Sequence, residues 1–518
     1  MAAEPRRAGL PGGSWRWLLA NQRWRWLVLL AAVSIVELGY AFIASAGRWT
    51  RWPIFDTGVD YLAEGFRAGH LHLSREPPAA LVRQPNPFDP VNRNLWFWDA
   101  SLYKGHYYLY WGPVPALLLA AGKSVLRISR HLGDQYAVFA LATLQLIAGT
   151  ILADRIARRA FAGIPVGFVV LAVVVFGFAN PTPFLLAREG VYEAAIIGGH
   201  AFLLLGLVFA FDAVWKAESR LASNLYAAAA GIAWALALGC RITLGPAVLA
   251  LGLVTAFVVA RRARERWSRF AQSLLWLGLP VMLGVGGLLL YNKLRFERSL
   301  EFGRSFQLTW IDFPWSTSFV TANLYSYALR PLDTSCKFPF VSAAVRMGTR
   351  AFPNGFRLPK DYFVDEQVAG FLVATPWTWL APAAVLVCGW TMTRVLRRSA
   401  AFDGPAAARA WLTASLAIAG SVSFAPALWA PTATMRHMGD VAGAIVLLAT
   451  LGAWSLYAAA RANTVFRWLV VVACSGLAAV TVSIGLALGF EGYYGHFRTH
   501  NPALLDQLEA RWSVCRHH

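Results

Sequence analysis

Residues 25–45, RWLVLLAAVSIVELGYAFIAS, form the stretch that decides the fold. The run is almost entirely apolar, and about 20 such residues are enough for an α-helix to cross a bilayer. No small-residue cleavage site followed by a soluble domain comes after it, so we expect a retained membrane anchor rather than a signal peptide. Five arginines precede or open the run: Arg6, Arg7, Arg16, Arg23 and Arg25.

Apolar runs of this kind recur from one end of the chain to the other. Of the 518 residues, 57% are hydrophobic and only 14% are charged, so most of the chain must lie in something other than water. The sequence therefore predicts an all-α, polytopic transmembrane bundle of about eleven spanning helices. The ten runs after the first lie at about 134–153, 164–183, 190–214, 224–239, 243–260, 270–291, 368–393, 407–428, 438–459 and 464–489.

A further apolar run at 107–126 is expected not to span. It begins YYLYWGPVPALLLA, and its prolines and aromatic residues suit an interfacial or re-entrant segment better than a regular spanning helix. If it crossed the membrane, the basic DRIARRAF stretch at 154–161 would fall outside, against the positive-inside rule. The five N-terminal arginines place the N-terminus in the cytoplasm of a bacterial-type plasma membrane. With 107–126 not spanning, every later basic cluster also falls on the cytoplasmic side, and the C-terminus lies outside.

This topology divides the chain into a small number of parts. They are a cytoplasmic basic N-terminus 1–24, an N-terminal transmembrane module 25–291 that includes outer loop 46–106, an outer loop 292–367, C-terminal transmembrane helices 368–489, and an outer tail 490–518. Two shorter segments, LLAREGVYEAA at 185–195 and TATMRHMGD at 432–440, reach the same outer face. Acids and bases of an otherwise apolar protein thus converge on one surface.

Several classes of function are excluded by the same sequence. The formal net charge of +20 does not indicate nucleic-acid binding, because the arginines mark the ends of apolar runs and match topology signals and contacts with membrane lipids. No glycine-rich phosphate loop is present, so no nucleotide cofactor is expected. The five cysteines lack metal-binding or redox spacing, and a Cys336–Cys515 bridge would require both residues to face an oxidising compartment.

Asp56 is the leading catalytic candidate. It lies at the exit of the first helix, where a partly desolvated carboxylate would serve as a general base toward an acceptor hydroxyl or hold a divalent cation. The alternative is that Asp56 only caps the helix VDYLAEGFRAG at 59–69, since Asp is a preferred N-cap. Asp60, inside that helix, is expected to pair with Arg67 or face water. No dedicated metal site is predicted, and whether a cation is needed stays open.

The other candidate residues are expected to bind a phosphate or another part of a substrate. Arginine suits phosphate because its planar guanidinium group donates two parallel hydrogen bonds. The alternative for these arginines is that they contact anionic lipid or form a salt-bridge cluster at the membrane interface. His200, within a span, is expected to make an interhelical hydrogen bond rather than bind a metal. The candidates are Arg188, Glu189, Tyr192, Arg295 and Arg436, with Glu193 one turn beyond Glu189, Arg298 and Arg304 beside Arg295, and Arg241 as a further arginine.

Four stretches resemble one known family, the C-class multi-spanning glycosyltransferases. FDTGVDYLAEGFRAGHL at 55–71 is similar to the first-loop signature of that family, with the pattern Asp56, Tyr61, Ala63, Phe66 and Gly69. YKGHYYLYWGPVPALLL at 103–119 resembles its proline-containing entry to an apolar run. YNKLRFERSLEFG at 291–303 and MRHMGDVAGAIVLLA at 435–449 resemble segments of members related to protein mannosyltransferases and lipid A sugar transferases.

The resemblance implies a sugar donor carried on polyprenyl phosphate and transfer, usually with inversion, to an acceptor on the outer face. The acceptor would be a glycan, a lipid or a protein. The first-loop acid of the family corresponds to Asp56 as general base, the acid of the second outer segment corresponds best to Glu189, and Arg188, Arg295 and Arg436 would contact the phosphate. The family often has Asp-Glu in the first loop, whereas here Thr57 follows Asp56, which puts metal binding by an adjacent pair in doubt.

Two other classes of protein fit the same composition. A transporter or flippase would place its site at mid-membrane between repeated halves, but no internal repeat is evident and the ionisable residues gather at one face. A non-catalytic membrane scaffold would use the interfacial arginines and aromatic residues as lipid anchors only.

Overall fold

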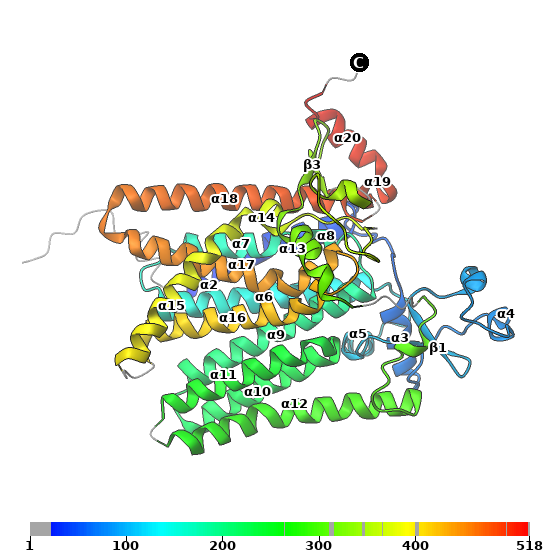
Figure 1. The fold of residues 1–518 in the computed structure, drawn as a ribbon, viewed down its shortest axis with the longest axis horizontal. Coiled ribbons are helices and arrows are strands. Elements are labelled where there is room, and N and C mark those ends of the chain that lie inside the picture. The colour runs from blue at the N-terminus through cyan, green and yellow to red at the C-terminus, as the bar shows by residue number, and fades with distance from the viewer. Residues whose placement is uncertain are drawn as a thin grey trace, which may run out of the picture.

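The structure is a computed structural model that describes residues 22–263, 265–309, 315–343, 348–364, 366–398, 403–493 and 495–515. It is a bundle of long helices that run side by side (Figure 1). Most of the predicted N-terminal segment 1–24 lies outside the described residues. The long helices are α2 Gln22–Ala44, α6 Gln135–Ala160, α7 Val166–Phe178, α9 Val191–Trp215, α10 Arg220–Cys240, α11 Gly245–Arg261, α12 Arg266–Phe296, α15 Ala381–Arg398, α16 Gly404–Leu428, α17 Gly439–Ala459 and α18 Thr464–Glu491.

The predicted polytopic helical bundle is confirmed. Within the described ranges, ten helices are long and apolar enough to cross a membrane, counting α7 together with the short α8 Thr182–Leu185. The chain is therefore an integral, multi-pass membrane protein. The predicted run 368–393 is not among the ten. Pro376 interrupts it, so that the chain forms α14 Phe371–Ala374, the 3-10 helix η6 Pro376–Leu380 and only then α15. The 18 residues of α15 include three arginines, Arg394, Arg397 and Arg398, which make it too polar to count as a span.

Helix α9 lies at the centre of the bundle and α12 and α18 lie at its edge. In the apolar window of α9, 89% of the residues are buried inside the protein, against 17% in α12 and 28% in α18. Small residues let neighbouring helices approach α9 closely: a Cβ added to Gly206 would come within 2.2 Å of Trp234, whose indole N–H donates to the Leu203 carbonyl across the α9–α10 contact. The central helix is thus the most firmly positioned element of the fold.

One end of the bundle carries the basic clusters. Arg159 of α6 and Arg262, directly after α11, both pair with Asp403, at 3.7 and 3.2 Å. Arg25 at the start of α2 pairs with Asp154 of α6 in the same region. Helix ends that are far apart in the sequence therefore meet here, as the charge pattern predicts.

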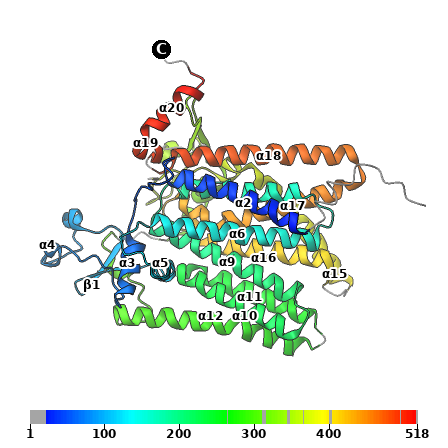
Figure 2. The same cartoon turned by 180° about the vertical axis from the view of Figure 1, so that it is seen from behind.

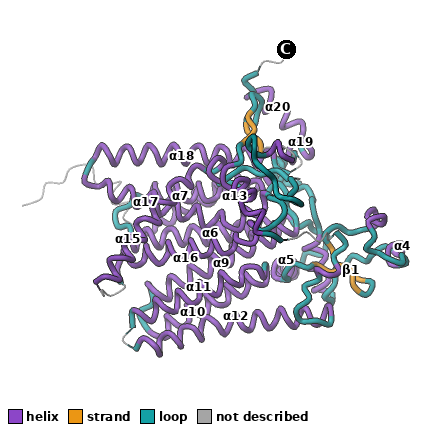
Figure 3. Tube along the Cα trace, viewed as in Figure 1, coloured by secondary structure: helices purple, strands orange, loops and turns teal. Residues whose placement is uncertain are grey.

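The opposite end carries the long loops and the shorter elements (Figures 1 to 3). The first outer loop folds into α3 Gly58–Arg67, α4 Ala79–Val82, η1 Pro90–Leu95 and a hairpin of β1 Ala100–Tyr103 and β2 His106–Leu109. The second holds η3 Arg304–Phe306, η4 Thr317–Phe319, α13 Val320–Leu329, a hairpin of β3 Leu332–Thr334 and β4 Val341–Ala343, and η5 Gly348–Ala351. The further short helices at this end are η2 Ile242–Leu244, η7 Met435–Met438, α19 His496–His500 and α20 Pro502–Trp512, the last helix of the described chain. The short η8 Ala460–Ala462 lies at the basic end, where Arg461 donates to the Ala162 carbonyl.

The run 107–126 does not span, in agreement with the prediction. Its first residues belong to β2, and its helix, α5 Val114–Val125, has only 12 residues. Figures 1 and 2 both show α5 nearly end-on, so that it lies across the ends of the long helices. Pro115 lies in the first turn of α5, where the N–H group that proline lacks would have no hydrogen-bond partner within the helix.

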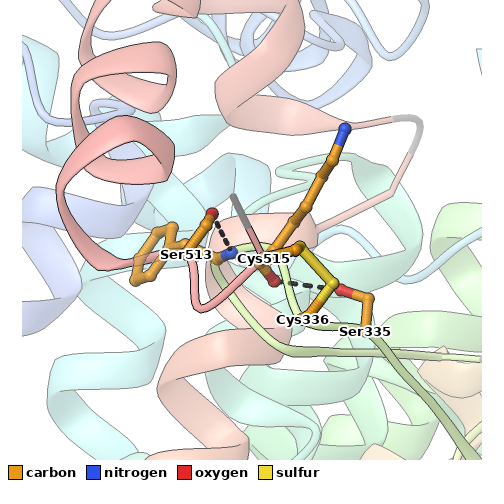
Figure 4. Close-up of a disulfide and its surroundings, with 6 residues drawn as sticks. Ser335, Cys336, Ser513 and Cys515 are labelled. Carbon is orange, nitrogen blue, oxygen red and sulfur yellow. Dashed lines mark hydrogen bonds between the residues drawn. A yellow bond between two sulfur atoms is a disulfide. The ribbon is translucent and has the colours of Figure 1, made fainter. Parts of the chain in front are cut away.

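A disulfide joins the second outer loop to the C-terminal tail. Cys336 and Cys515 are bonded with their Cα atoms 5.4 Å apart (Figure 4). Hydrogen bonds flank it, since the Val514 N–H donates to the Cys336 carbonyl and the Phe338 N–H donates to the Ser513 hydroxyl. The bridge that the sequence made conditional on an oxidising compartment is therefore formed.

Candidate functional site

The first outer loop meets the start of the central helix at Asp56. One carboxylate oxygen of Asp56 lies 3.4 Å from the N–H of Val191, the first residue of α9. A Cβ added to Gly190 would come 3.0 Å from a Glu193 oxygen and 3.4 Å from the same Asp56 oxygen. Asp56 and Glu193 therefore both face the Cβ side of Gly190, the N-cap of the most firmly held helix of the bundle.

Capping of α3 falls mainly to a different residue from the one that the sequence suggested. The two carboxylate oxygens of Asp134 accept the Val59 and Asp60 N–H groups, each at 3.0 Å. Asp56 accepts the adjacent Thr57 N–H at 2.7 Å and reaches the Gly58 N–H at 3.4 Å. Since Asp134 satisfies the helix terminus, Asp56 keeps its second oxygen for the α9 side.

The expectation for Asp60 is wrong. Asp60 is fully buried and pairs with Lys123 of α5 at 2.7 Å, while Arg67 donates to the Ile128 carbonyl. The sequence gives no sign of this pair, because Lys123 sits in an apolar run 63 residues away. Burial of a lysine requires a partner, and α5 finds one only by lying across α3.

A charged cluster forms beside Asp56 from three separate segments. Arg436 of η7 pairs with Glu366 at 3.0 Å, and Arg188 lies 3.9 Å from the same Glu366 oxygen. Arg188 also lies 3.9 Å from Glu193. We call Arg188, Glu193, Glu366 and Arg436 the outer charge cluster. The side chain of Glu193 is 1% exposed and the other three are 12–15% exposed, so the cluster lies at the edge of solvent.

Aromatic side chains frame the outer charge cluster. The guanidinium carbon of Arg436 lies 4.2 Å from the ring centre of Tyr192, and that of Arg188 lies 4.4 Å from Tyr493. The Tyr110 and Tyr192 hydroxyls are 2.6 Å apart. These stacking contacts fix the planes of both arginines, which is the geometry that arginine uses for bidentate recognition of an anion.

Asp99 is a second carboxylate of the first loop that the sequence did not single out. It has a left-handed backbone with φ of 60°, and it accepts hydrogen bonds from the Thr309 hydroxyl at 3.0 Å and the Gln307 amide at 3.4 Å. Burial raises the pKa of Asp99, and the charges of Arg436 and Asp56 act on it in opposite directions. Asp99 therefore belongs to the same electrostatic environment as Asp56.

Glu189 is buried beside the cluster rather than in it. It is 1% exposed, and neither carboxylate oxygen has a hydrogen-bond partner among the described residues. Burial raises the pKa of Glu189 well above its ordinary value. Of the two acids in this segment, Glu193 is the one that shares Gly190 with Asp56.

A cavity of about 840 Å³ opens next to Tyr110 and Tyr192. Its apolar wall includes Leu238 of α10 and Leu288 of α12. Pockets for small molecules commonly have this size and combine apolar walls with a few polar groups. The remaining lining residues are Trp111, Gly112, Cys240, Arg241, Ile242, Thr243, Leu300, Glu301, Phe302, Arg304, Ser305 and His437.

The basic side of the cavity is tied to the helix bundle. Arg241 pairs with Asp440 at 2.9 Å, and the His200 ring nitrogen of α9 lies 3.3 Å from the other Asp440 oxygen. His200 thus makes a close ionic contact between α9 and α17, in place of the aligned interhelical hydrogen bond that the sequence predicts. This chain of contacts links the cavity wall to two of the long helices.

Arg295 is not brought together with the other predicted arginines. Its guanidinium donates to the Leu109 carbonyl at 2.6 Å and to the Asn292 side chain at 2.7 Å, and it stacks on Tyr291 at 3.8 Å. Its side chain is buried, so these donors fix the end of β2 against α12. Arg304, in the same loop, does line the cavity.

Comparisons with known proteins give no close relative. The sequence matches no protein-family model and no curated protein. Among solved structures, the fold is similar to an apo oligosaccharyltransferase from Archaeoglobus fulgidus, with 12% identity, 90% of this chain and 56% of that chain covered, and a TM-score of 0.45. It is also similar to the oligosaccharyltransferase AglB from the same organism in complex with an inhibitory peptide and a dolichol-phosphate, with 12% identity, 89% and 56% covered, and a TM-score of 0.46.

A third similar structure is ArnT from Cupriavidus metallidurans bound to undecaprenyl phosphate. The identity is 14%, 94% of this chain and 77% of that chain are covered, and the TM-score is 0.43. The chain spans only 56% of the length of the archaeal structures.

Proposed function

We propose that this protein is a membrane glycosyltransferase that moves a sugar from a polyprenyl-phosphate carrier to an acceptor on the outer face of the membrane. The observation that carries the proposal is the junction at Tyr192. Tyr192 lines a cavity with apolar walls and its ring stacks with Arg436 of the outer charge cluster. It is one residue from the Val191 N–H that Asp56 contacts. A lipid-linked donor needs this combination of apolar volume, cationic groups and a nearby carboxylate.

The roles of the residues follow from the chemistry of transfer with inversion. The acceptor oxygen forms a bond to the anomeric carbon while the bond from that carbon to the phosphate oxygen breaks. The proton of the acceptor hydroxyl passes to Asp56, and the polyprenyl phosphate leaves with the electron pair. Arg188 and Arg436 would stabilise the negative charge on the leaving phosphate, and Arg241 would contact it from the cavity wall.

Positive charge beside Asp56 comes from arginine side chains. Two groups of metal-ligating side chains occur among the described residues, and neither includes Asp56. The positive charge next to Asp56 is supplied by the guanidinium groups of the outer charge cluster. We therefore propose that arginines do the work of charge neutralisation at this site.

The orientation in the membrane and the division into parts belong to the same proposal. The Cys336–Cys515 disulfide lies at the loop end, and disulfides persist in oxidising compartments outside the cytoplasm. The basic clusters lie at the other end, where cytoplasmic loops carry them. We infer a cytoplasmic N-terminus, an outer C-terminus, outer loops 46–106 and 292–367, and an outer tail 490–518.

The test is sugar transfer by purified protein in lipid nanodiscs. Wild type is incubated with a panel of synthetic polyprenyl-phosphate sugars, with and without a chelator, and sugar release and transfer are measured. Asp56→Asn should lose at least a hundredfold in rate at unchanged melting temperature, because an amide cannot accept the proton. Asp134→Asn is the matched variant, since it changes a buried acid of the same loop region: it should lower the melting temperature and keep turnover at permissive temperature.

Two results would contradict the proposal. Equal turnover by wild type and Asp56→Asn would remove Asp56 from the chemistry. No turnover by wild type with any donor, together with movement of a lipid-linked or small polar substrate across the membrane, would favour the transporter alternative.

A further inference from the structure

A group of histidines lies in the first outer loop, away from the outer charge cluster. His70 and His72 follow α3, and His106 opens β2. The His72 ring stacks on His106 with ring centres 4.2 Å apart and on His70 at 4.8 Å. Glu76 completes the group, with a carboxylate oxygen 3.3 Å from the His106 Nδ1. We call His72, Glu76 and His106 the loop histidine site.

We propose that the loop histidine site binds a zinc ion. One ligand atom from each of the three residues lies within 4.8 Å of the other two, a spacing that small rotations of the side chains would close around one ion. Two imidazoles and one carboxylate are a usual ligand set for Zn²⁺, with the fourth position left for water. Mg²⁺ and Ca²⁺ prefer oxygen ligands, so they would not be selected by this set.

Two details of the geometry indicate a site built for ligation rather than a simple stack of rings. The His72 Nδ1 lies 2.9 Å from the Leu73 carbonyl, which assigns the proton to Nδ1 and leaves Nε2 as a lone-pair donor. The His106 Nδ1 is buried and lies 3.3 Å from Glu76, but it has no aligned hydrogen bond among the described residues. Both atoms are thus available to a third partner.

The backbone holds these side chains in place. The Leu73 N–H donates to the Tyr107 carbonyl at 2.9 Å, which ties the His72 segment to β2 next to His106. A Cβ added to Gly65 of α3 would come within 2.1 Å of the His72 carbonyl, so this segment packs directly on the helix. The two histidine segments are therefore positioned by the fold before an ion arrives, which reduces the entropic cost of binding.

A second group with suitable spacing, Asp60, Glu64 and His131, serves as the contrast. The Lys123 ammonium lies 2.7 Å from Asp60 and 2.9 Å from Glu64. A cation already occupies the place between these carboxylates, and Asp60 also accepts the Leu132 N–H. This group is satisfied by the protein and would not bind zinc.

Zinc at the loop histidine site would brace the β1–β2 hairpin against α3. The hairpin follows Asp99 directly, and Asp56 directly precedes the N-terminal cap of α3. Binding would therefore stabilise the loop that carries both carboxylates, without contact to the outer charge cluster. The inference stands whether or not the proposed transferase activity is found.

The experiment is zinc binding by the full-length protein in detergent, freed of any polyhistidine tag and stripped with chelator. Isothermal titration with ZnCl₂ should give one site, and 100 μM ZnCl₂ should raise the melting temperature whereas MgCl₂ should not. His106→Gln and Glu76→Gln should each weaken zinc binding at least tenfold with little change in the melting temperature of the metal-free protein. His131→Gln, from the contrast group, should bind as wild type does.

Some results would overturn the inference. One is that wild type shows no saturable zinc binding up to 100 μM. The other is that wild type, His106→Gln and Glu76→Gln bind zinc with equal affinity. Loss of binding in His131→Gln but not in His106→Gln would move the ion to the Asp60 group. If His106→Gln does not fold, Glu76→Gln decides the question, because the exposed Glu76 leaves the stacked rings intact.

Discussion

Lys123→Met tests how α3, and with it Asp56, is held at the end of the bundle. The side chains of Lys123 and Asp60 are both 0% exposed and lie 2.7 Å apart. Methionine keeps most of the length and apolar stem of lysine but leaves the Asp60 carboxylate buried without its cation. Removing one partner of a buried ion pair costs about 3–5 kcal/mol. Asp60 still accepts the Leu132 N–H and still lies 2.7 Å from His131, so we expect the lower end, about 3 kcal/mol.

The assay is reversible unfolding in mixed micelles with increasing denaturing detergent. The double variant Lys123→Met/Asp60→Asn, which removes the buried charge as well as its partner, should recover at least half of the lost stability. Lys104→Met is the matched control, because Lys104 pairs with Glu297 where both side chains are more than half exposed, and it should have no measurable effect. Equal unfolding of wild type and Lys123→Met would refute the role given to this pair.

Three further predictions concern the outer end. Gly190→Ala should lower sugar transfer at least tenfold with little loss of stability, because its Cβ would press on the Glu193 carboxylate, which lies beside Asp56, while its extended backbone accepts alanine; unchanged transfer would contradict this. Cys336→Ser should cost about 2–4 kcal/mol of unfolding free energy, and reductant should destabilise wild type but not this variant. Burial raises the pKa of Asp99, so its ionisation costs stability as pH rises above the ordinary carboxyl range; Asp99→Asn should melt above wild type at pH 7 and level with it near pH 4.

The helical bundle could be predicted because each span is a local property of the sequence. An apolar run of sufficient length crosses a membrane whatever surrounds it, and basic residues at its ends report which ends share a side. The non-spanning segment was predictable for the same reason, since its prolines lie within the run itself. The interruption at Pro376 follows the same local rule, but it was hidden inside an otherwise apolar stretch.

The site was predictable only in part, because it depends on contacts between distant segments. Arg188, Tyr192 and Arg436 were recognisable as ionisable or aromatic residues at the mouths of helices, and they do meet. Glu366 and Asp99 lie in loops with no periodic pattern, and nothing near them in the sequence marks them as partners of those residues. Their roles arise from tertiary packing alone.

The outer charge cluster explains how the second outer loop takes part in the site. Two guanidinium groups close together repel each other, and Glu366 offsets that repulsion by contacting both Arg188 and Arg436 through one oxygen. Under the proposed function, the donor phosphate would bring a second negative charge to the same two arginines, whose spacing Glu366 fixes. Loop 292–367 therefore contributes a carboxylate near its end to the outer charge cluster, whereas Arg295 near its start fixes the β2–α12 contact.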